Sequence, residues 1–368
     1  MKENLFSIIK FFWENKEATI KQISKATDLD KSTISRYLKN LKDTGIIQTV
    51  GSLKQGPKGG RKTQIQSFNY NIFNILGLEI EQNGINCVVT NLKGDPIDNF
   101  RIKEKINKSN LVKMIQKIIE EKKDSNICAC GISLPGIINS KEGIIVYSKA
   151  LGIENFKLVS ELSKVNDIPF LIDNDSNVGA AYYNLKLKGS AKNILYVYIS
   201  IPYDIHDFVG VGIGIIISNH LYHGSNNCSG EYEFKLRLIE KNNGYVNDYY
   251  DFLNTHLEDE IFYEIKTFLS KLAGEIGLLV GIIDPDTVIF DGGIKFLPEI
   301  AIKFLVEETR NNLFLSKQRN INFITEKKNE PVTAVGAAIN FITKIFENKQ
   351  YLAKIFKRQI NNGALEIK

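Results

Sequence analysis

Residues 19–45 read TIKQISKATDLDKSTISRYLKNLKDTG, and this stretch predicts two short helices joined by a tight turn. Thr19 suits the N-cap of the first helix, and Asp30 or Ser32 suits the N-cap of the second. Gly45 is a suitable C-terminal stop. The buried stripe of the second helix is formed by Ile34, Tyr37, Leu38 and Leu41. Two such helices are typical of a helix-turn-helix, whose second helix can enter the major groove of DNA.

The outward face of the second helix is polar and basic, which suits contact with nucleic acid. Lysine and arginine neutralise phosphates, while serine and threonine hydroxyls can bind phosphate oxygens or base edges. The candidate DNA-contacting residues on this helix are Lys31, Ser32, Thr33, Ser35, Arg36 and Lys39. A small helical domain that uses the same layout for protein contacts is the alternative.

Residues 46–70 predict a hairpin, because an apolar run and an alternating run flank the basic tip SLKQGPKGGRKTQ. This hairpin holds four basic residues and no acidic one. Its glycines allow the backbone to approach a phosphate or the minor groove closely. A basic tip beside a helix-turn-helix is typical of a wing, in which Lys58, Arg61 and Lys62 are the candidate DNA contacts.

The positive charge is concentrated at the N-terminus. Residues 1–62 contain 13 lysine and arginine residues and 6 acidic ones, a net charge of +7. The whole chain carries +5, so the residues after 62 carry −2. Such an asymmetry indicates a polyanion-binding head on a nearly neutral body, the alternative being a basic face that is merely solvated.

Length and composition fit a soluble protein of more than one domain. The chain has 368 residues, of which 43% are hydrophobic and 24% charged, against a norm of roughly 150 residues per domain. The longest apolar run, residues 208–217, has 10 residues, whereas a membrane-spanning helix needs about 20. Charged residues interrupt the N-terminal apolar patch before a signal-peptide core could form, and four cysteines do not indicate a disulfide framework. We therefore expect a cytoplasmic protein without a membrane segment.

Beyond residue 70, β-rich runs alternate with runs of helical period, which predicts an α/β body. Seven short motifs mark the chain in a fixed order. They are GGRK at 59–62, GISLPG at 131–136, DND at 173–175, GVGIG at 210–214, GE at 230–231, DGG at 291–293 and AVGAA at 334–338. No single motif is specific, but their order over nearly the whole chain resembles the ROK family of repressors, open reading frames and kinases. The resemblance is to the transcriptional repressors of that family, which carry an extra DNA-binding head.

This resemblance implies an N-terminal winged helix-turn-helix followed by an actin-like α/β body of the sugar-kinase type, with a ligand in the cleft between two lobes. We expect the head to span residues 1–70. The first lobe is expected to comprise residues 71–180 and 334–368, and the second residues 181–333.

The body is expected to lack kinase activity and to need no cofactor. Phosphoryl transfer requires a carboxylate near the attacking hydroxyl and a cradle of backbone N–H groups for the phosphates. By resemblance, the catalytic base of the family's kinases corresponds to Asp175 in the pair Asn174-Asp175. The alternative is a turn or helix-capping aspartate before Asn177. The family's kinases carry G-x-D-x-G-G-T on the first hairpin, but this chain reads GLEIEQN, with Glu81 and Gln82 in place of two glycines. These side chains would block a phosphate, and the carboxylate would repel it.

The family's usual zinc site is not expected here. That site has a histidine a few residues after Gly-Glu and a cysteine cluster beyond it, whereas Phe234 stands here and no cysteine follows Cys228. That histidine also commonly touches the sugar in the family. Phe234 in its place therefore implies an altered sugar pocket. His220, His223 and Cys228 lie close together in the sequence and superficially suit a metal, but a polar loop after a strand explains them better.

Residue matching to the family nominates five sugar-binding residues. They are Gly136, Asn155, Asn174, Asp175 and Glu231. Paired amide and carboxylate groups suit vicinal hydroxyls, because each can donate or accept in a fixed geometry. Asn155 could equally be a turn residue.

The sequence therefore predicts a sugar-responsive transcriptional repressor that binds operator DNA as a homodimer or tetramer and senses a sugar effector in its cleft. Symmetric half-sites in DNA favour a dimeric protein. One alternative is an ATP-dependent sugar kinase that retains a DNA-binding head. Another is a repressor whose body no longer binds sugar and serves dimerisation or docking of a protein partner.

Overall fold

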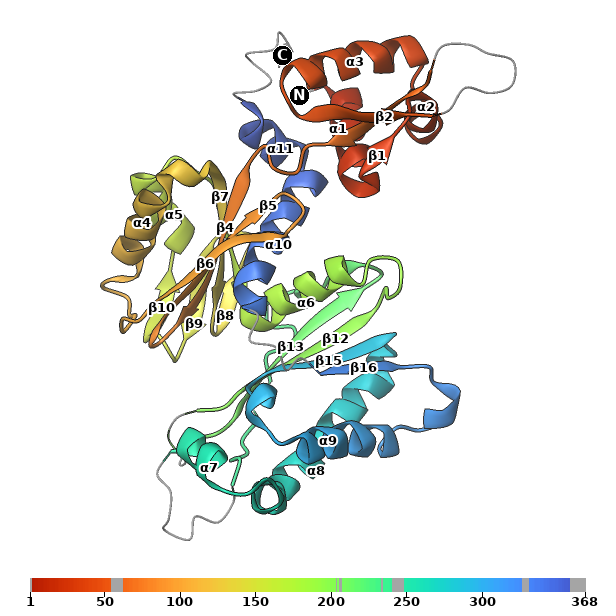
Figure 1. The fold of residues 1–368 in the computed structure, drawn as a ribbon. Helices are drawn as coiled ribbons and strands as arrows, with labels where there is room; N and C mark the ends of the chain where they lie inside the picture. Colours follow the sequence, from red (N-terminus) through yellow and green to blue (C-terminus); the bar gives the residue numbers. More distant parts are fainter. Residues whose placement is uncertain are drawn as a thin grey trace.

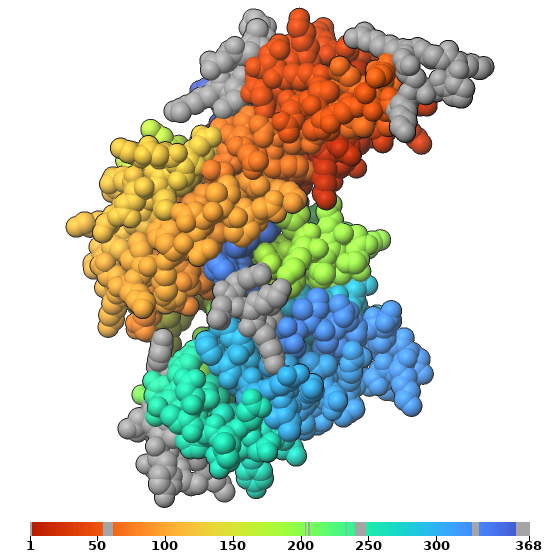
Figure 2. All heavy atoms as spheres, viewed as in Figure 1, coloured from red at the N-terminus to blue at the C-terminus, as the bar shows by residue number. Residues whose placement is uncertain are grey.

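The computed structural model describes residues 2–53, 62–202, 204, 207–232, 234–239, 248–325 and 331–357. A small N-terminal head stands at one end, followed by two α/β lobes (Figure 1). The space-filling view shows these three parts in line, so that the molecule is elongated (Figure 2). No helix in the described ranges is both long and apolar enough to cross a membrane.

The head is a three-helix unit closed by a small sheet. Its elements are α1 (Glu3–Asn15), β1 (Glu17–Ala18), α2 (Ile20–Thr27), α3 (Lys31–Asp43), β2 (Ile47–Ser52) and β3 (Gln64–Phe68). The sheet order is β1-β3-β2. Thr19 caps α2, and the Asp30 carboxylate caps α3 by accepting from the Thr33 N–H at 2.8 Å. The predicted helix-turn-helix and hairpin are confirmed, with Asp30 rather than Ser32 as the N-cap of α3.

The first lobe is built on a five-stranded sheet of order β11-β7-β4-β5-β6. Its strands are β4 (Asn74–Glu81), β5 (Gly84–Asn91), β6 (Pro96–Ile102), β7 (Ile127–Leu134) and β11 (Phe170–Asn174). Leu76, Leu78 and Ile80 pack on one face with α4 (Leu111–Glu121) and α5 (Leu158–Val165). The 3₁₀ turn η1 (Lys123–Ser125) follows α4, and a small sheet joins β8 (Ile137–Asn139), β9 (Ile144–Ser148) and β10 (Ile153–Phe156).

The second lobe has its own five-stranded sheet, of order β14-β13-β12-β15-β16. Its strands are β12 (Ile194–Ser200), β13 (Gly210–Ile217), β14 (His220–Leu221), β15 (Thr287–Gly292) and β16 (Asn322–Thr325). The outer face is covered by helical elements, namely α7 (Tyr249–Thr255), α8 (Glu258–Ile283), η2 (Gly293–Phe296) and α9 (Glu299–Asn311). The 3₁₀ turn η3 (Ser316–Gln318) follows α9. The predicted actin-like α/β class is confirmed, while the predicted lobe boundaries stay a prediction.

Two helices lie between the sheets, namely α6 (Asp175–Lys186) and α10 (Val332–Glu347) (Figure 1). Glycines let α10 approach the first sheet closely. A Cβ at Gly77 would lie 2.0 Å from the Ala334 carbonyl oxygen, and one at Gly131 would lie 2.0 Å from that of Ala337. The helix α6, which begins at Asp175 of the DND motif, packs beside α10.

The head shares one continuous apolar core with α10 and α11 (Lys349–Ile355). The Trp13 indole of α1 stacks on Phe346 of α10 with ring centroids 4.5 Å apart, and its Nε1–H donates to the Leu92 carbonyl at 3.0 Å. The Glu3 carboxylate pairs with Lys349 at 2.8 Å. The orientation of the head is thus coupled to α10 by packing, which the charge asymmetry alone did not indicate.

Candidate functional site

Asn174 and Glu231, from different lobes, meet at the junction of β11 and α6. Asn174 is the N-cap of α6, and its Oδ1 accepts from the Asn177 N–H at 2.7 Å. Its amide Nδ2 donates to Glu231 Oε1 at 2.6 Å. Partial desolvation raises the pKa of Glu231, although the Asn174 hydrogen bond opposes this. The junction of β11 and α6 therefore places the Asn174 amide against the Glu231 carboxylate, which the second lobe supplies.

Asp175 lies beside this pair as the first residue of α6. Its Oδ1 accepts from the Ser176 N–H at 2.7 Å, and Gly212 of β13 lies against it. Burial raises the pKa of Asp175 from its ordinary 3.8 to about 7, with a further rise from the charge of Glu231. Near neutral pH this carboxyl can therefore accept a hydrogen bond from a hydroxyl, or donate one when protonated.

Gly136 and Asn155 lie at the small sheet of β8, β9 and β10. Gly136 has φ +111°, and a Cβ there would lie 2.3 Å from the Tyr147 carbonyl oxygen, so only glycine fits beside β9. Asn155 is an exposed residue of β10 with φ +46°. Within the described residues, no hydrogen bond joins either residue to Asn174, Asp175 or Glu231. Their part in sugar binding stays a prediction.

The sequence interpretation missed a polar row that crosses the whole first sheet. Register pairs place five polar residues side by side on the face that carries α10, namely Asp173, Ser133, Glu79, Asn86 and Arg101. The alternation of glycine and polar residues at 77 and 79, and again at 131 and 133, is the signal that could have revealed the row.

Glu79 is the buried centre of that row. Its carboxylate accepts from the Thr333 hydroxyl at the start of α10 and from Asn86 Nδ2 at 2.7 Å. Burial and the neighbouring Glu81 raise the pKa of Glu79 despite these hydrogen bonds. Glu81 itself forms an ion pair with Arg101 at 2.6 Å. Arg101 thus offsets part of the negative charge of Glu81, which was expected to repel a phosphate. That the side chains of Glu81 and Gln82 block a phosphate stays a prediction.

Asp173 is the meeting point of four elements. Its Oδ1 accepts from Asn177 Nδ2 of α6 at 2.8 Å, and its Oδ2 accepts from Asn340 Nδ2 of α10 at 3.1 Å. His223, in the loop after β14 of the second lobe, places its Nε2 2.8 Å from the same Oδ2. This contact, which we name the Asp173–His223 latch, joins the two lobes directly. The partner of His223 is thus Asp173. The sequence, in which His223 stands near His220 and Cys228, did not indicate this contact.

The latch is expected to be pH-dependent. Burial opposes the charged form of His223, but the hydrogen bond and charge of Asp173 outweigh burial and raise its pKa above 6.5. A raised histidine pKa gives stability that is fully present below pH 6.5 and is lost as the pH rises through the folded-state pKa. Since the side chain is 31% exposed, we expect His223→Gln to remove about 1 kcal/mol of stability at pH 6 and less at pH 8.

Thermal and urea unfolding of the unaltered protein and of His223→Gln at several pH values would measure this difference in stability. His220→Gln, in the adjacent strand β14, is the matched control and should leave the pH dependence unchanged. An equal loss of stability by His223→Gln at both pH values would contradict an ionic latch.

The position that corresponds to the family's zinc-binding histidine does not fit a metal. Phe234 is buried in the core of the second lobe, where its ring meets Phe268 edge-on at 5.8 Å. Across the described ranges, no group of three His, Cys, Asp or Glu side chains is placed to hold a metal ion.

The candidate nucleic-acid interface is the outer face of α3, on the side of the head away from the lobes (Figure 1). Its exposed residues are Lys31, Ser32, Ser35, Arg36 and Lys39. Thr33 is half-buried, and the Ser32 hydroxyl donates to Asp30 Oδ1 at 2.5 Å. Lys62 is exposed, whereas Lys58 and Arg61 lie outside the described residues.

Comparison with known proteins agrees with this architecture. Residues 75–233 match the ROK family model, and residues 7–49 match the model described as bacterial regulatory protein, arsR family. The chain is 31% identical over 240 residues to the xylose repressor of Bacillus subtilis (strain 168), covering 62% of this chain and 59% of that protein. It is 24% identical to a putative xylose repressor of Caldicellulosiruptor sp. (strain Rt8B.4), covering 95% of this chain and 98% of that protein.

Solved structures show the same fold. A ROK family transcriptional regulator, a homologue of the E. coli MLC protein, superposes with a TM-score of 0.72 at 16% identity, over 96% of this chain and 100% of that one. A ROK family glucokinase from Streptomyces griseus, in complex with glucose and AMPPNP, gives 0.56 at 15% identity, over 72% and 98%. Residues 75–233 of this chain thus match the ROK family model, and residues 7–49, which hold the N-terminal helix-turn-helix, match the arsR family model.

Proposed function

We propose that this protein is a sugar-responsive, DNA-binding transcriptional repressor without kinase activity. The observation that carries the proposal is that one helix, α10, serves both ends of the molecule. Asn340 of α10 bonds Asp173 beside the cleft, and Phe346, less than two turns further on, stacks on Trp13 of the head. A change in the cleft that moves α10 therefore moves the head.

The proposed sugar site is the cluster of Asn174, Asp175 and Glu231, bordered by Gly136 and Asn155. The amide and the two carboxyls offer donors and acceptors to adjacent hydroxyls. A sugar that binds the closed lobes better than the open ones shifts the equilibrium between them, and only this difference in affinity can release or retain DNA. Because the curated relatives above are named xylose repressors, we propose xylose as the first sugar to test.

In this proposal the protein acts as a symmetric dimer, because two heads then meet two half-sites of the operator. Closure of the lobes changes the distance between the two heads, so that it no longer matches the distance between the two half-sites. Operator DNA, a sugar effector and a second copy of the chain are thus the proposed partners.

The test is DNA binding with and without sugars. Purified protein is titrated against DNA fragments from upstream of its own gene and of neighbouring sugar-utilisation genes, with xylose, glucose and their phosphates present or absent. We expect xylose to change the affinity at least tenfold. Tight DNA binding with no sugar effect and no thermal shift by any sugar would instead favour a body that serves dimerisation or docking.

The kinase alternative draws support from Asp175, because a carboxyl whose pKa is about 7 suits a general base at neutral pH. Against it stand the side chains at 81 and 82, where the family's kinases have glycines. We expect no ADP formation from ATP and xylose or glucose above the rate without sugar. Sugar-dependent ADP production that Asp175→Asn abolishes would establish the kinase.

A further inference from the structure

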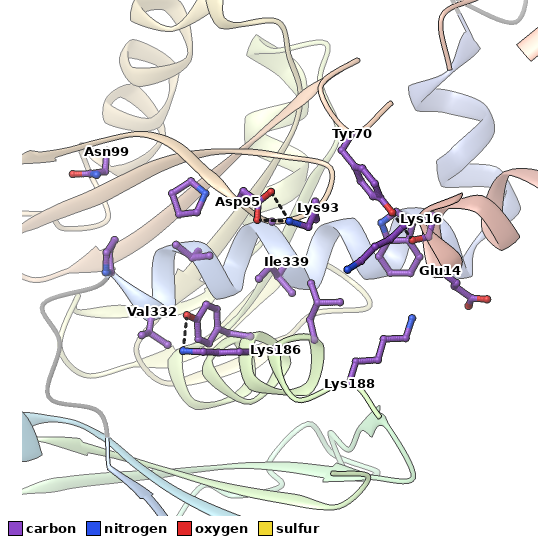
Figure 3. A pocket seen from close by; sticks show the side chains of 17 residues that line it. Glu14, Lys16, Tyr70, Lys93, Asp95, Asn99, Lys186, Lys188, Val332 and Ile339 are labelled. Atoms are coloured by element: carbon purple, nitrogen blue, oxygen red, sulfur yellow. Dashed lines mark hydrogen bonds and ion pairs between the residues drawn. The ribbon is translucent and has the colours of Figure 1, made fainter. Parts of the chain in front are cut away.

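A pocket of about 810 Å³ lies where the head meets the body (Figure 3). We name it the junction pocket. Its walls are the end of α1, the turn between β5 and β6, the end of α6 and the first half of α10. It is separate from the candidate sugar site, since none of Asn174, Asp175 and Glu231 lines it. Its volume is in the range that holds a small molecule.

The junction pocket combines a buried apolar wall with a cationic rim. Val335 and Ile339 of α10 are buried residues in its wall. The charged residues of its lining are Lys16, Lys93, Lys186 and Lys188 against Glu14 and Asp95, an excess of two positive charges. Lysine ammonium groups are compact charges that hold phosphate and similar anions.

Two of these lysines are available to a ligand. Lys93 is paired with Asp95 at 3.0 Å. Lys16 and Lys188 are exposed, and neither forms an ion pair with a described residue. Figure 3 shows Lys16 on the head side and Lys188 on the α6 side of the same opening. The Lys188 ammonium also lies 5.4 Å from the ring centre of Trp13, so it already contacts the head.

We propose that the junction pocket binds a small phosphorylated metabolite, with its phosphate between Lys16 and Lys188 and its uncharged body toward Val335 and Ile339. A phosphomonoester carries up to two negative charges near neutral pH, which matches the charge excess of the lining. An anion held by both lysines ties the head to α6. It is thus a second input to the orientation of the head, independent of the sugar site.

The binding part of this proposal does not rest on the proposed function, and the chain provides a local probe for it. Trp13 is the only tryptophan of the protein and lines the pocket. Trp13 fluorescence and calorimetry are followed while the full chain is titrated with fructose 6-phosphate, inorganic phosphate or fructose at constant ionic strength. We expect saturable binding of fructose 6-phosphate, at least tenfold weaker binding of inorganic phosphate, and none of fructose.

The variant Lys16→Gln/Lys188→Gln should weaken fructose 6-phosphate binding at least tenfold. Lys117→Gln/Lys303→Gln removes the same charge from exposed positions on α4 and α9 and should bind like the unaltered protein. Matching circular dichroism spectra and melting temperatures establish that both variants fold. Asp175→Asn separates the sites, because binding at the junction pocket should survive this change.

Three outcomes would overturn the proposal. They are no saturable binding of the phosphomonoester, equal binding by the Lys16→Gln/Lys188→Gln variant, and loss of binding in Asp175→Asn, which would place the ligand in the cleft. Equal affinity for inorganic phosphate would reduce the pocket to a simple anion site and overturn the choice of ligand. Failure of the repressor proposal shows separately, as absence of DNA binding.

Discussion

Replacing Arg36 and Lys39 together by alanine is expected to weaken DNA binding by about 30-fold or more, because each lost contact to a base edge costs about 1–3 kcal/mol. Both side chains are exposed on the outer face of α3, whose buried stripe lies on the opposite side. Their removal should leave the head folded. The loss should be largest at low salt, since contacts to phosphate release counterions.

Fluorescence anisotropy with a labelled DNA fragment, repeated over a range of salt concentrations, measures this effect. We expect the slope of log affinity against log salt to become less steep by about one unit for each phosphate contact removed. The matched control is Lys117→Ala/Lys303→Ala, which changes the net charge equally on the body. Wild-type affinity of Arg36→Ala/Lys39→Ala at matched salt would show that α3 is not the recognition helix.

Asp175→Asn is expected to stabilise the protein above pH 7 and to weaken sugar binding. The pKa of Asp175 is raised from 3.8 to about 7, so the folded state binds the proton more tightly than the unfolded state. Stability is then greatest below pH 4 and falls as the pH rises to 7. Each pKa unit corresponds to about 1.4 kcal/mol. Because Asp175 is only half-buried, solvent screens part of this effect, and we expect the free energy of unfolding of Asp175→Asn to be higher by about 2 kcal/mol at pH 8.

The same substitution removes a carboxylate from the proposed sugar site, where we expect at least a tenfold loss of sugar affinity. Urea unfolding at pH 5 and pH 8 and calorimetric titration with xylose measure the two effects. Asp124→Asn, at an exposed position in η1, is the control and should change neither quantity. A variant less stable than the unaltered protein at pH 8 would argue against the raised pKa.

The sequence alone determined the parts of this protein whose physics is local. Helical period and capping residues predicted α2 and α3, since a capping carboxylate such as that of Asp30 acts on N–H groups within one turn. The exposed basic face of α3 followed from the same period. The order of short glycine and acidic motifs resembles that of the ROK family, and this resemblance implied the fold.

Only the tertiary structure decided how the lobes and head are joined. Asp173 and His223 are 50 residues apart in sequence, and Asp173 and Asn340 are 167 apart. Local patterns carry no information about such contacts, because they depend on the register of one sheet and the placement of α10. Glu79 likewise became a buried carboxyl with a raised pKa only when Thr333 and Asn86 closed around it. Polar groups withdrawn from water must find partners wherever the fold places them. The resulting network joins the two lobes to α10, which packs against the head.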